Sequence, residues 1–225
     1  MGKRARRRWR VVVTAGPTRE PLDAVRFLSN ASTGRMGIEV AREARARGAD
    51  VTLVLGPTSE RPPEGVALVR VETCREMLTA ARAAARSADL VVFAAAPADW
   101  RPAVRARGKL KKDGSGRPRT LTLVENPDVA ATLGRRKRGR VHVGFALEVA
   151  RPFFFARRKL RKKRFDAIVL NGPANVGGGG GDVWWIRPDA APAALPSGDK
   201  RTTAVAITSH AFALLDASHP RPARR

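Results

Sequence analysis

The stretch VVVTAGPTREPLDAVRFLSNASTGRMG at residues 11–37 predicts an apolar strand, a polar loop and the start of a helix. Val11–Val13 are β-branched and uninterrupted by polar residues, as in a strand buried on both faces, and Gly16 and Pro17 end the strand. Apolar residues recur at helical spacing from Met36 onward. This order predicts a loop at the carboxyl end of a buried strand, followed by a helix start.

The expected helix start is surrounded by residues that suit an anion. Ser29–Thr33 offers side chains that cap helices, and two glycines then open the helix. Free N–H groups and the helix dipole attract anions at such an end, and an arginine adds a full positive charge. The Gly-x-x-Gly motif is neither a dinucleotide fingerprint nor a Walker loop, so the residues alone leave phosphate binding and an ordinary capped helix both open. The substrate-phosphate candidates are Ser32, Thr33, Gly34, Arg35 and Gly37.

Length and composition favour one globular domain. The chain has 225 residues, of which 43% are hydrophobic, and this suffices for a real core. We expect a single domain over residues 11–218, between solvated, poorly ordered basic tails at 1–10 and 219–225. The net charge of +24, from 44 basic against 20 acidic residues, suggests nucleic acid, an anionic membrane or polyanionic small substrates as partners. Charge alone does not choose among them.

The sequence also constrains location, disulfides and metals. The first apolar run, residues 11–15, is too short for a signal peptide or a membrane span, so we expect a cytoplasmic protein without membrane attachment. Cys74 is the one cysteine, which excludes an internal disulfide. His142, His210 and His219 lie far apart in sequence and form no metal-binding pattern. We therefore expect no tightly bound transition metal and no dedicated metal site on the protein.

Apolar runs alternate with amphipathic segments along the chain, which is the pattern of βαβ units. The alternation predicts an α/β fold with a mostly parallel sheet. Strands are expected at 11–15, 51–55, 66–71, 90–96, 120–124, 141–147 and 167–170, with two more at 183–186 and 203–207 as a small hairpin-like C-terminal extension. Helices are expected from Gly34 to near Gly48, at 75–87, from Asn126-Pro127-Asp128 onward with Asn126 as the cap, at 153–164 and at 210–215.

The most apolar of the expected strands is LVVFAAA at Leu90–Ala96, and we place it at the centre of the sheet. In open α/β sheets ligands bind outside the carboxyl ends of the strands. The loop at Pro97–Pro102 follows this strand end, so it is expected to belong to the site.

Two basic segments and one glycine run follow. Ala103–Arg119 is rich in Gly, Lys and Arg and cannot pack by itself, which predicts a mobile flap whose lysines close over a phosphorylated ligand; a solvated basic loop is the alternative. Lys159 and Lys163 are four residues apart on one helical face and can reach a common polyanion, although such a charge run also fits a solvated face. Gly177–Gly181 is expected to be a flexible turn.

Six separated blocks, which together span nearly the whole chain, carry a family resemblance. They are TAGPTREPLDAVRFLSNASTGRMG at 14–37, AAAPADWRP at 94–102, KLKK at 109–112, ENPDV at 125–129, VGFALE at 143–148 and RKLRKKRFDAIVLN at 158–171. In this order they resemble the phosphopantothenoylcysteine synthetase (phosphopantothenate-cysteine ligase) family of coenzyme A biosynthesis, in its bacterial form. The resemblance implies a Rossmann-like, mostly parallel sheet with helices on both faces.

The resemblance also implies a two-step ligation. A nucleoside triphosphate activates the carboxylate of 4′-phosphopantothenate as an acyl nucleotidylate and releases pyrophosphate, and the amine of cysteine then displaces the nucleotide. In the bacterial form the nucleotide is CTP, with Mg²⁺ on its phosphates, and the protein is typically a homodimer. We also expect a homodimer because the strands predicted at 183–186 and 203–207 are too marginal to stand alone as an exposed hairpin.

Site residues follow from the resemblance by motif. Asn30 is expected to contact the acyl nucleotidylate, and Lys109 on the flap is expected to be catalytic. The implied nucleotide site consists of Phe93, Ala94, Ala95, Asp99, Lys109, Pro127, Asp128, Val129, Ala130, Phe145, Lys159 and Lys163. This chemistry needs no nucleophilic side chain, because positioning and electrostatics can carry it.

Some features depart from the family pattern. Asn171 is followed by Gly172-Pro173 and a run of five glycines, where the pattern has an Asn-Asp-type turn. The flavin-dependent decarboxylase domain that is often fused in bacteria is not expected in this chain, so neither decarboxylation nor bound FMN is predicted.

Two other classes of protein remain as alternatives. The charge favours a basic α/β nucleic-acid-binding protein without turnover, but aromatics for base stacking are few and several acidic residues fall in the expected site loops. A nicotinamide-dependent oxidoreductase would need the glycine fingerprint that is absent after the first strand.

Overall fold

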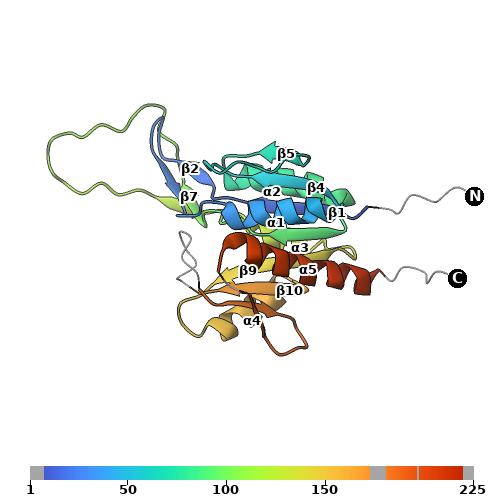
Figure 1. Cartoon of the computed structure of the whole chain (residues 1–225). Coiled ribbons are helices and arrows are strands. Elements are labelled where there is room, and N and C mark those ends of the chain that lie inside the picture. Colours follow the sequence, from blue (N-terminus) through green and yellow to red (C-terminus); the bar gives the residue numbers. More distant parts are fainter. Residues whose placement is uncertain (1–7, 173–180, 197, 220–225) are drawn as a thin grey trace, which may run out of the picture.

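The computed structural model describes residues 8–172, 181–196 and 198–219. An eight-stranded sheet runs through the molecule in the order β12-β11-β10-β9-β6-β1-β4-β5 (Figure 1). The six strands from β10 to β5 are parallel, and β11 is antiparallel to both of its neighbours. The strands are β1 (Arg10–Ala15), β4 (Asp50–Leu55), β5 (Ala67–Arg70), β6 (Leu90–Phe93), β9 (Val141–Leu147), β10 (Ala167–Asn171), β11 (Val183–Ile186) and β12 (Ala193–Leu195).

The strand order reverses beside β1. The chain adds β4 and β5 on one side of β1 and then crosses to the other side to add β6, β9 and β10, as in a Rossmann-like sheet. Val13 lies opposite Leu53 on β4 and opposite Val92 on β6. The predicted parallel sheet with Leu90–Ala96 at its centre is confirmed, although the regular strand ends at Phe93.

Helices cover both faces of the sheet, as predicted (Figure 1). One face packs against α1 (Arg35–Ala46) and α5 (Lys200–Ser218). The other face packs against α2 (Cys74–Ala84), which a short 3-10 turn extends to Ser87, and against α3 (Val129–Gly134) and α4 (Pro152–Lys162).

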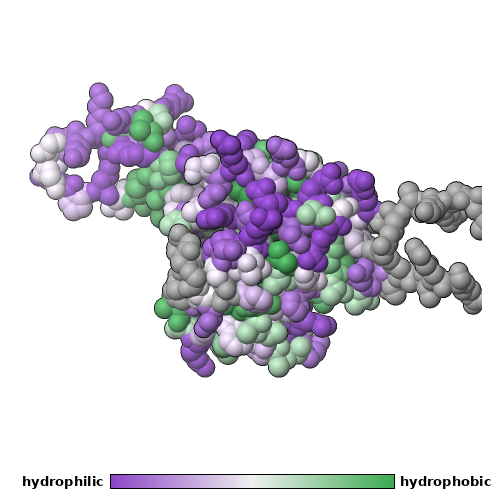
Figure 2. Space-filling model, viewed as in Figure 1, coloured by the Kyte–Doolittle hydropathy of each residue, from purple (hydrophilic) through white to green (hydrophobic). Residues whose placement is uncertain are grey.

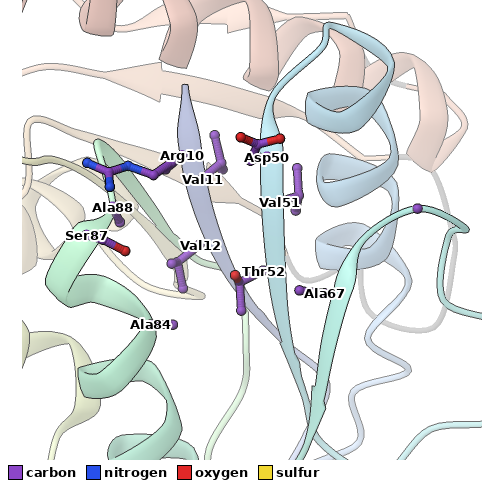
Figure 3. A pocket seen from close by; sticks show the side chains of 11 residues that line it. Arg10, Val11, Val12, Asp50, Val51, Thr52, Ala67, Ala84, Ser87 and Ala88 are labelled. Carbon is purple, nitrogen blue, oxygen red and sulfur yellow. The ribbon is translucent and has the colours of Figure 1, made fainter. Parts of the chain in front are cut away.

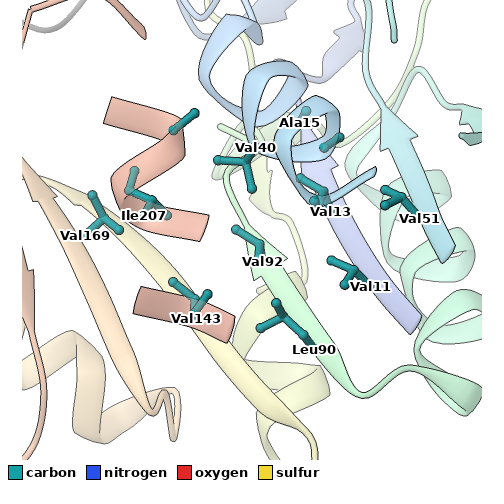
Figure 4. Close-up of a cluster of buried hydrophobic side chains, with 14 of the residues drawn as sticks. Val11, Val13, Ala15, Val40, Val51, Leu90, Val92, Val143, Val169 and Ile207 are labelled. Atoms are coloured by element: carbon teal, nitrogen blue, oxygen red, sulfur yellow. The ribbon is translucent and has the colours of Figure 1, made fainter. Parts of the chain in front are cut away.

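Two hydrophobic clusters explain why the central strands are apolar throughout. Successive side chains of a strand point to opposite faces, so Val11 and Val13 join the α1 and α5 side while Val12 joins the α2 side. Figure 4 shows Val40 of α1 and Ile207 of α5 above the strands on the first side. Because both faces are covered, alternation with polar residues is unnecessary.

Two short hairpins and one long loop lie outside the main sheet. β2 (Arg19–Pro21) pairs with β3 (Phe27–Ser29), and β7 (Trp100–Pro102) pairs with β8 (Leu123–Glu125). Residues 103–122 connect β7 to β8 without helix or strand and project away from the body of the molecule (Figure 1). The flap predicted at 103–119 lies within this loop, and from here on the flap means residues 103–122.

Of the two strands predicted for a C-terminal hairpin, the first is confirmed and the second is wrong. Residues 183–186 form β11, but residues 203–207 lie inside α5, and the partner of β11 is β12. A short apolar run fits a strand or a buried helix equally well. Here Asp199 accepts a hydrogen bond from the Thr202 N–H (2.6 Å) and caps α5, whose buried residues recur at helical spacing over α1.

Other boundaries also differ from the predictions. The strand predicted at 120–124 is β8 and belongs to a hairpin, and the cap of α3 is Asp128 rather than Asn126, because its carboxylate accepts from the Ala131 N–H (2.9 Å). The turn predicted at 177–181 lies almost entirely outside the described residues. In the part of the chain that the structure describes, no helix is both long and apolar enough to cross a membrane.

Candidate active site

A cavity of about 720 Å³ opens at the carboxyl edge of the sheet, beside the reversal of strand order between β1 and β6. The ends of four parallel strands reach it through Thr14 of β1, Phe93 of β6, Phe145 of β9 and Asn171 of β10. Open α/β sheets bind ligands at this place, because loops diverge there and helix N-termini point inward.

Most of the residues predicted from sequence meet in this cavity. Those in its lining are Asn30, Ser32, Thr33, Gly34, Arg35, Phe93, Ala94, Ala95, Asp99, Pro127, Asp128, Val129, Ala130, Phe145, Lys159 and Lys163. Gly37 and Lys109 are not in the lining. Segments more than 100 residues apart therefore form one surface.

The helix α1 begins without the side-chain cap that the sequence suggests. Its N-cap is Gly34 in a left-handed conformation (φ 78°), where a Cβ atom would lie 3.0 Å from the Gly16 Cα atom. The hydroxyls of Ser32 and Thr33 accept hydrogen bonds from the N–H groups of Gly34 and Arg35, both at 3.3 Å. Glycine is thus needed where the helix start meets the end of β1.

Gly37 has a packing role. A Cβ atom there would lie 2.5 Å from the Cβ atom of Ala15, so the absence of a side chain lets α1 approach β1 closely. Gly37 is therefore a buried packing residue that lies next to Ala94 of the cavity lining and is not itself part of that lining.

Asn30 is held against the loop that follows β6. Its Nδ2 atom donates to the Ala96 carbonyl (3.1 Å) and to the Pro97 carbonyl (3.0 Å). These bonds fix the orientation of the amide at the cavity wall. Asn126 binds the next two residues of the same loop, since its Nδ2 atom donates to the Ala98 carbonyl (2.9 Å) and its N–H to the Asp99 carbonyl (2.7 Å).

Lys159 of α4 and Lys163, the residue that caps the end of α4, also line the cavity. The Lys163 Nζ atom lies 2.9 Å from an Asp128 carboxylate oxygen, at the start of α3. Burial alone would raise the pKa of Asp128, but the Ala131 N–H and Lys163 outweigh it and lower the pKa. Burial, and next the charge of Lys163, lowers the pKa of Lys159. Both lysines line the cavity, and a polyanion bound there would stabilise the charge of each.

Some lining residues carried no usable signal in the sequence. Lys200 begins α5 and reaches the cavity beside Arg35, although 165 positions separate the two. Burial, and next the charge of Arg35, lowers the pKa of Lys200. The lining also includes Glu60 and Cys74, and burial raises the pKa of the Cys74 thiol to about 11. A lone lysine after a proline-rich loop has no motif that would have revealed it.

The flap holds Lys109 outside the cavity. Asp23, buried in the turn between β2 and β3, accepts a hydrogen bond from the Leu110 N–H (3.0 Å), and Arg26 donates to the Leu110 carbonyl (2.5 Å). The Arg26 guanidinium, and next the Leu110 N–H, keeps the pKa of the Asp23 carboxyl well below its usual range. The flap is therefore attached to the β2–β3 hairpin next to Lys109.

A second, smaller cavity of about 330 Å³ lies at the opposite edge, around the amino ends of β1 and β4 (Figure 3). Its lining is mostly apolar or neutral, and the backbone N–H of its Arg10 donates to the Asp89 carboxylate (2.9 Å). In the described residues, no group of three or more His, Cys, Asp or Glu side chains could hold a metal ion. The larger cavity is the candidate active site.

Comparison with known proteins agrees with this geometry. Residues 7–214 match the family model described as the DNA/pantothenate metabolism flavoprotein C-terminal domain. The chain belongs to this family. A crystal structure of the C-terminal domain of the coenzyme A biosynthesis bifunctional protein CoaBC superposes with a TM-score of 0.81 and 34% identity, covering 93% of this chain and 96% of that one.

Two curated relatives of the family are CoaBC proteins. The one from Vibrio vulnificus is 43% identical over 162 residues, which cover 72% of this chain and 40% of that protein. The one from Mycobacterium bovis is 42% identical over 215 residues, which cover 88% of this chain and 50% of that protein. The chain thus spans at most half the length of these two relatives, and its likeness is to one domain of them.

Proposed function

We propose that this chain is a phosphopantothenate-cysteine ligase that acts through an acyl nucleotidylate. The observation that carries the proposal is the cavity at the strand reversal, where Arg35, Lys159 and Lys163 meet the starts of α1 and α3. Two phosphorylated substrates need such a basic surface. The relatives in this family are named for coenzyme A biosynthesis, which supports this choice of substrates.

In the first step a carboxylate oxygen of 4′-phosphopantothenate attacks the α-phosphorus of the nucleotide. The bond from this phosphorus to the bridging oxygen breaks, and pyrophosphate leaves. Negative charge grows on the phosphoryl oxygens and on the leaving group, where Lys159 and Lys163 stabilise it. We place the nucleotide along Phe93, Asp99, Pro127–Ala130 and Phe145, and the phosphate of the other substrate at Ser32–Arg35.

In the second step the cysteine amine attacks the acyl carbon. The bond from this carbon to the nucleotide oxygen breaks, the nucleoside monophosphate leaves, and the amine loses a proton to solvent. Asn30 lies at the cavity wall with its amide orientation fixed, which suits a residue that contacts the acyl nucleotidylate. Positioning and charge stabilisation suffice for both steps.

CTP is our proposed nucleotide, with Mg²⁺ on its phosphates. The cavity residues fit a metal that arrives with the nucleotide, since Asp128 is engaged by Lys163 and phosphate oxygens are preferred magnesium ligands. When bound, Mg²⁺ neutralises phosphate charge. Measuring kcat/KM for CTP and for ATP on one preparation tests the choice of base, and a clear preference for ATP would reject CTP. We assign no flavin-dependent step to these residues.

We also propose a homodimer, but not because strands at 183–186 and 203–207 need a partner, as the sequence suggested. β11 is covered by β12 and α5 within one chain, so these strands need no partner. Exposed apolar side chains lie instead on the two projecting hairpins and the flap, namely Val25, Phe27, Trp100, Val104, Leu121 and Leu123. Figure 2 shows green patches in this region among mostly hydrophilic residues. A second copy would bury these apolar side chains. Light scattering at micromolar concentration that shows a monomer would reject the dimer.

A half-reaction tests the ligase itself. Mixing the protein, Mg²⁺, 4′-phosphopantothenate and labelled CTP without cysteine should release about one equivalent of pyrophosphate per site and then stop. Adding cysteine should restart turnover. A nucleic-acid-binding protein would release none and would instead bind DNA or RNA with strong salt dependence. No burst under these conditions would overturn the proposed function.

A further inference from the structure

The backbone of the loop at residues 96–99 is bound at almost every position. The carbonyls of Ala96 and Pro97 accept from Asn30, and those of Ala98 and Asp99 accept from Asn126. The Ala98 N–H donates to the Thr18 hydroxyl oxygen at 3.0 Å. This last bond joins the loop to the core of the molecule and not to the cavity wall.

Thr18 makes this bond from a fully buried position. Its side chain is 0% exposed, and its hydroxyl donates to the Glu20 Oε1 atom at 3.0 Å. A hydroxyl has one proton to donate. Because Glu20 takes that proton, a lone pair of the oxygen is left facing the Ala98 N–H.

Glu20 in turn connects the loop to a helix start. It is 2% exposed, and its Oε1 atom also accepts from the N–H of Cys74, the first residue of α2, at 2.8 Å. The Cys74 thiol lies 3.4 Å from the Pro127 carbonyl at the cavity. A buried carboxylate is costly unless it is fully hydrogen-bonded, so this one is expected to be rigidly held.

We propose that Thr18 and Glu20 are positioning residues for the ligation. They hold the 96–99 backbone at the place where Asn30 and Asp99 meet the acyl nucleotidylate, without touching a substrate themselves. The inference rests on the proposed function for its catalytic readout. Its structural part, the restraint of the Ala98 N–H, can be measured independently.

The test replaces the hydroxyl at constant volume. Thr18→Val leaves the Ala98 N–H without its acceptor, and Thr18→Ser keeps the hydroxyl. Thr208→Val is the matched control, because Thr208 is 1% exposed on α5 and its hydroxyl has no hydrogen-bond partner among the described residues. Each variant is tested by the rate constant and the amplitude of the pyrophosphate burst, and by hydrogen exchange of the Ala98 amide.

We expect Thr18→Val to slow the burst rate constant by about tenfold to a hundredfold, as misplacement of a catalytic group does, and to speed exchange at Ala98. Thr18→Ser should keep the burst rate constant and the Ala98 exchange rate close to those of wild type, and Thr208→Val should change neither rate. A purely structural defect would lower the amplitude, because fewer molecules are folded, and would leave the rate constant unchanged.

The two proposals fail separately. If wild-type protein gives no burst, the ligase assignment fails, while exchange at Ala98 still decides whether Thr18 restrains the loop. In that case, an Ala98 exchange rate in Thr18→Val equal to that of the wild-type protein would overturn the inference. If the wild-type protein gives a burst, a burst rate constant in Thr18→Val equal to that of wild type would overturn the inference.

Discussion

His142 should make the folded protein sensitive to mild acid. It lies on β9 at 0% exposure, with its ring 5.3 Å from that of Phe93, and neither ring nitrogen has a hydrogen-bond partner in the described part of the chain. Burial, and next the charges of Lys137 and Arg140, lowers the pKa of the imidazole from 6.5 to about 3. The folded protein therefore keeps this ring neutral at any ordinary pH.

The size of the effect follows from proton linkage. Below pH 6.5 the unfolded chain takes up a proton at His142 that the folded chain does not, so the free energy of unfolding falls as the pH falls towards 3. With a pKa of 6.5 in the unfolded chain and about 3 in the folded protein, the free energy of unfolding is lower by about 2 kcal/mol at pH 5 and almost unchanged above pH 7.5.

Urea unfolding at pH 7.5, 6 and 5 measures this loss, with His142→Leu as the comparison. The variant replaces the ring by an apolar side chain that cannot titrate, while every other group is retained. Between pH 7.5 and pH 5, wild-type protein should lose about 2 kcal/mol more than the variant. Equal losses in the two proteins would refute the assignment of a neutral, unpartnered imidazole to this position.

Three further predictions concern the candidate active site. Lys163→Ala should lower kcat/KM for CTP by about tenfold through loss of a charge-assisted contact, whereas Lys162→Ala, at the exposed end of α4, should not; equal effects in steady-state kinetics would contradict this. Asn30→Asp should lower turnover by on the order of a hundredfold, because a carboxylate cannot donate to the Ala96 and Pro97 carbonyls and misplacement of a site wall has effects of this size; full activity in a folded variant would leave Asn30 a structural residue. Lys109→Ala should slow the pyrophosphate burst more than it weakens CTP binding, and Lys111→Ala should leave the burst rate unchanged. If both variants lose the same burst rate and the loss shrinks with added salt, the flap lysines act only through their general positive charge.

The sequence by itself determined the parts of this protein that depend on local pattern. Uninterrupted β-branched runs such as Val11–Val13 indicate strands covered on both faces, and the alternation with amphipathic segments indicates a parallel sheet. The most apolar run, at Leu90–Ala96, is indeed central. Loops at carboxyl strand ends converge by geometry, which predicted a site at this edge of the sheet, and the family resemblance supplied most of the individual lining residues.

Tertiary structure alone decided what depends on distant partners. Residues 203–207 form a helix because Asp199 caps it and α1 covers it, and neither fact is visible in a short apolar run. Gly34 replaces the expected side-chain cap because its backbone meets Gly16, which lies in another loop.

The same holds for the polar groups around the cavity. The bond from Ala98 to Thr18 joins residues 80 positions apart, and the bond from Cys74 to Glu20 joins residues 54 apart. Composition and periodicity indicate which positions of a strand or helix are buried in the core. They do not report which buried donor meets which acceptor, because that depends on how the whole chain closes around it.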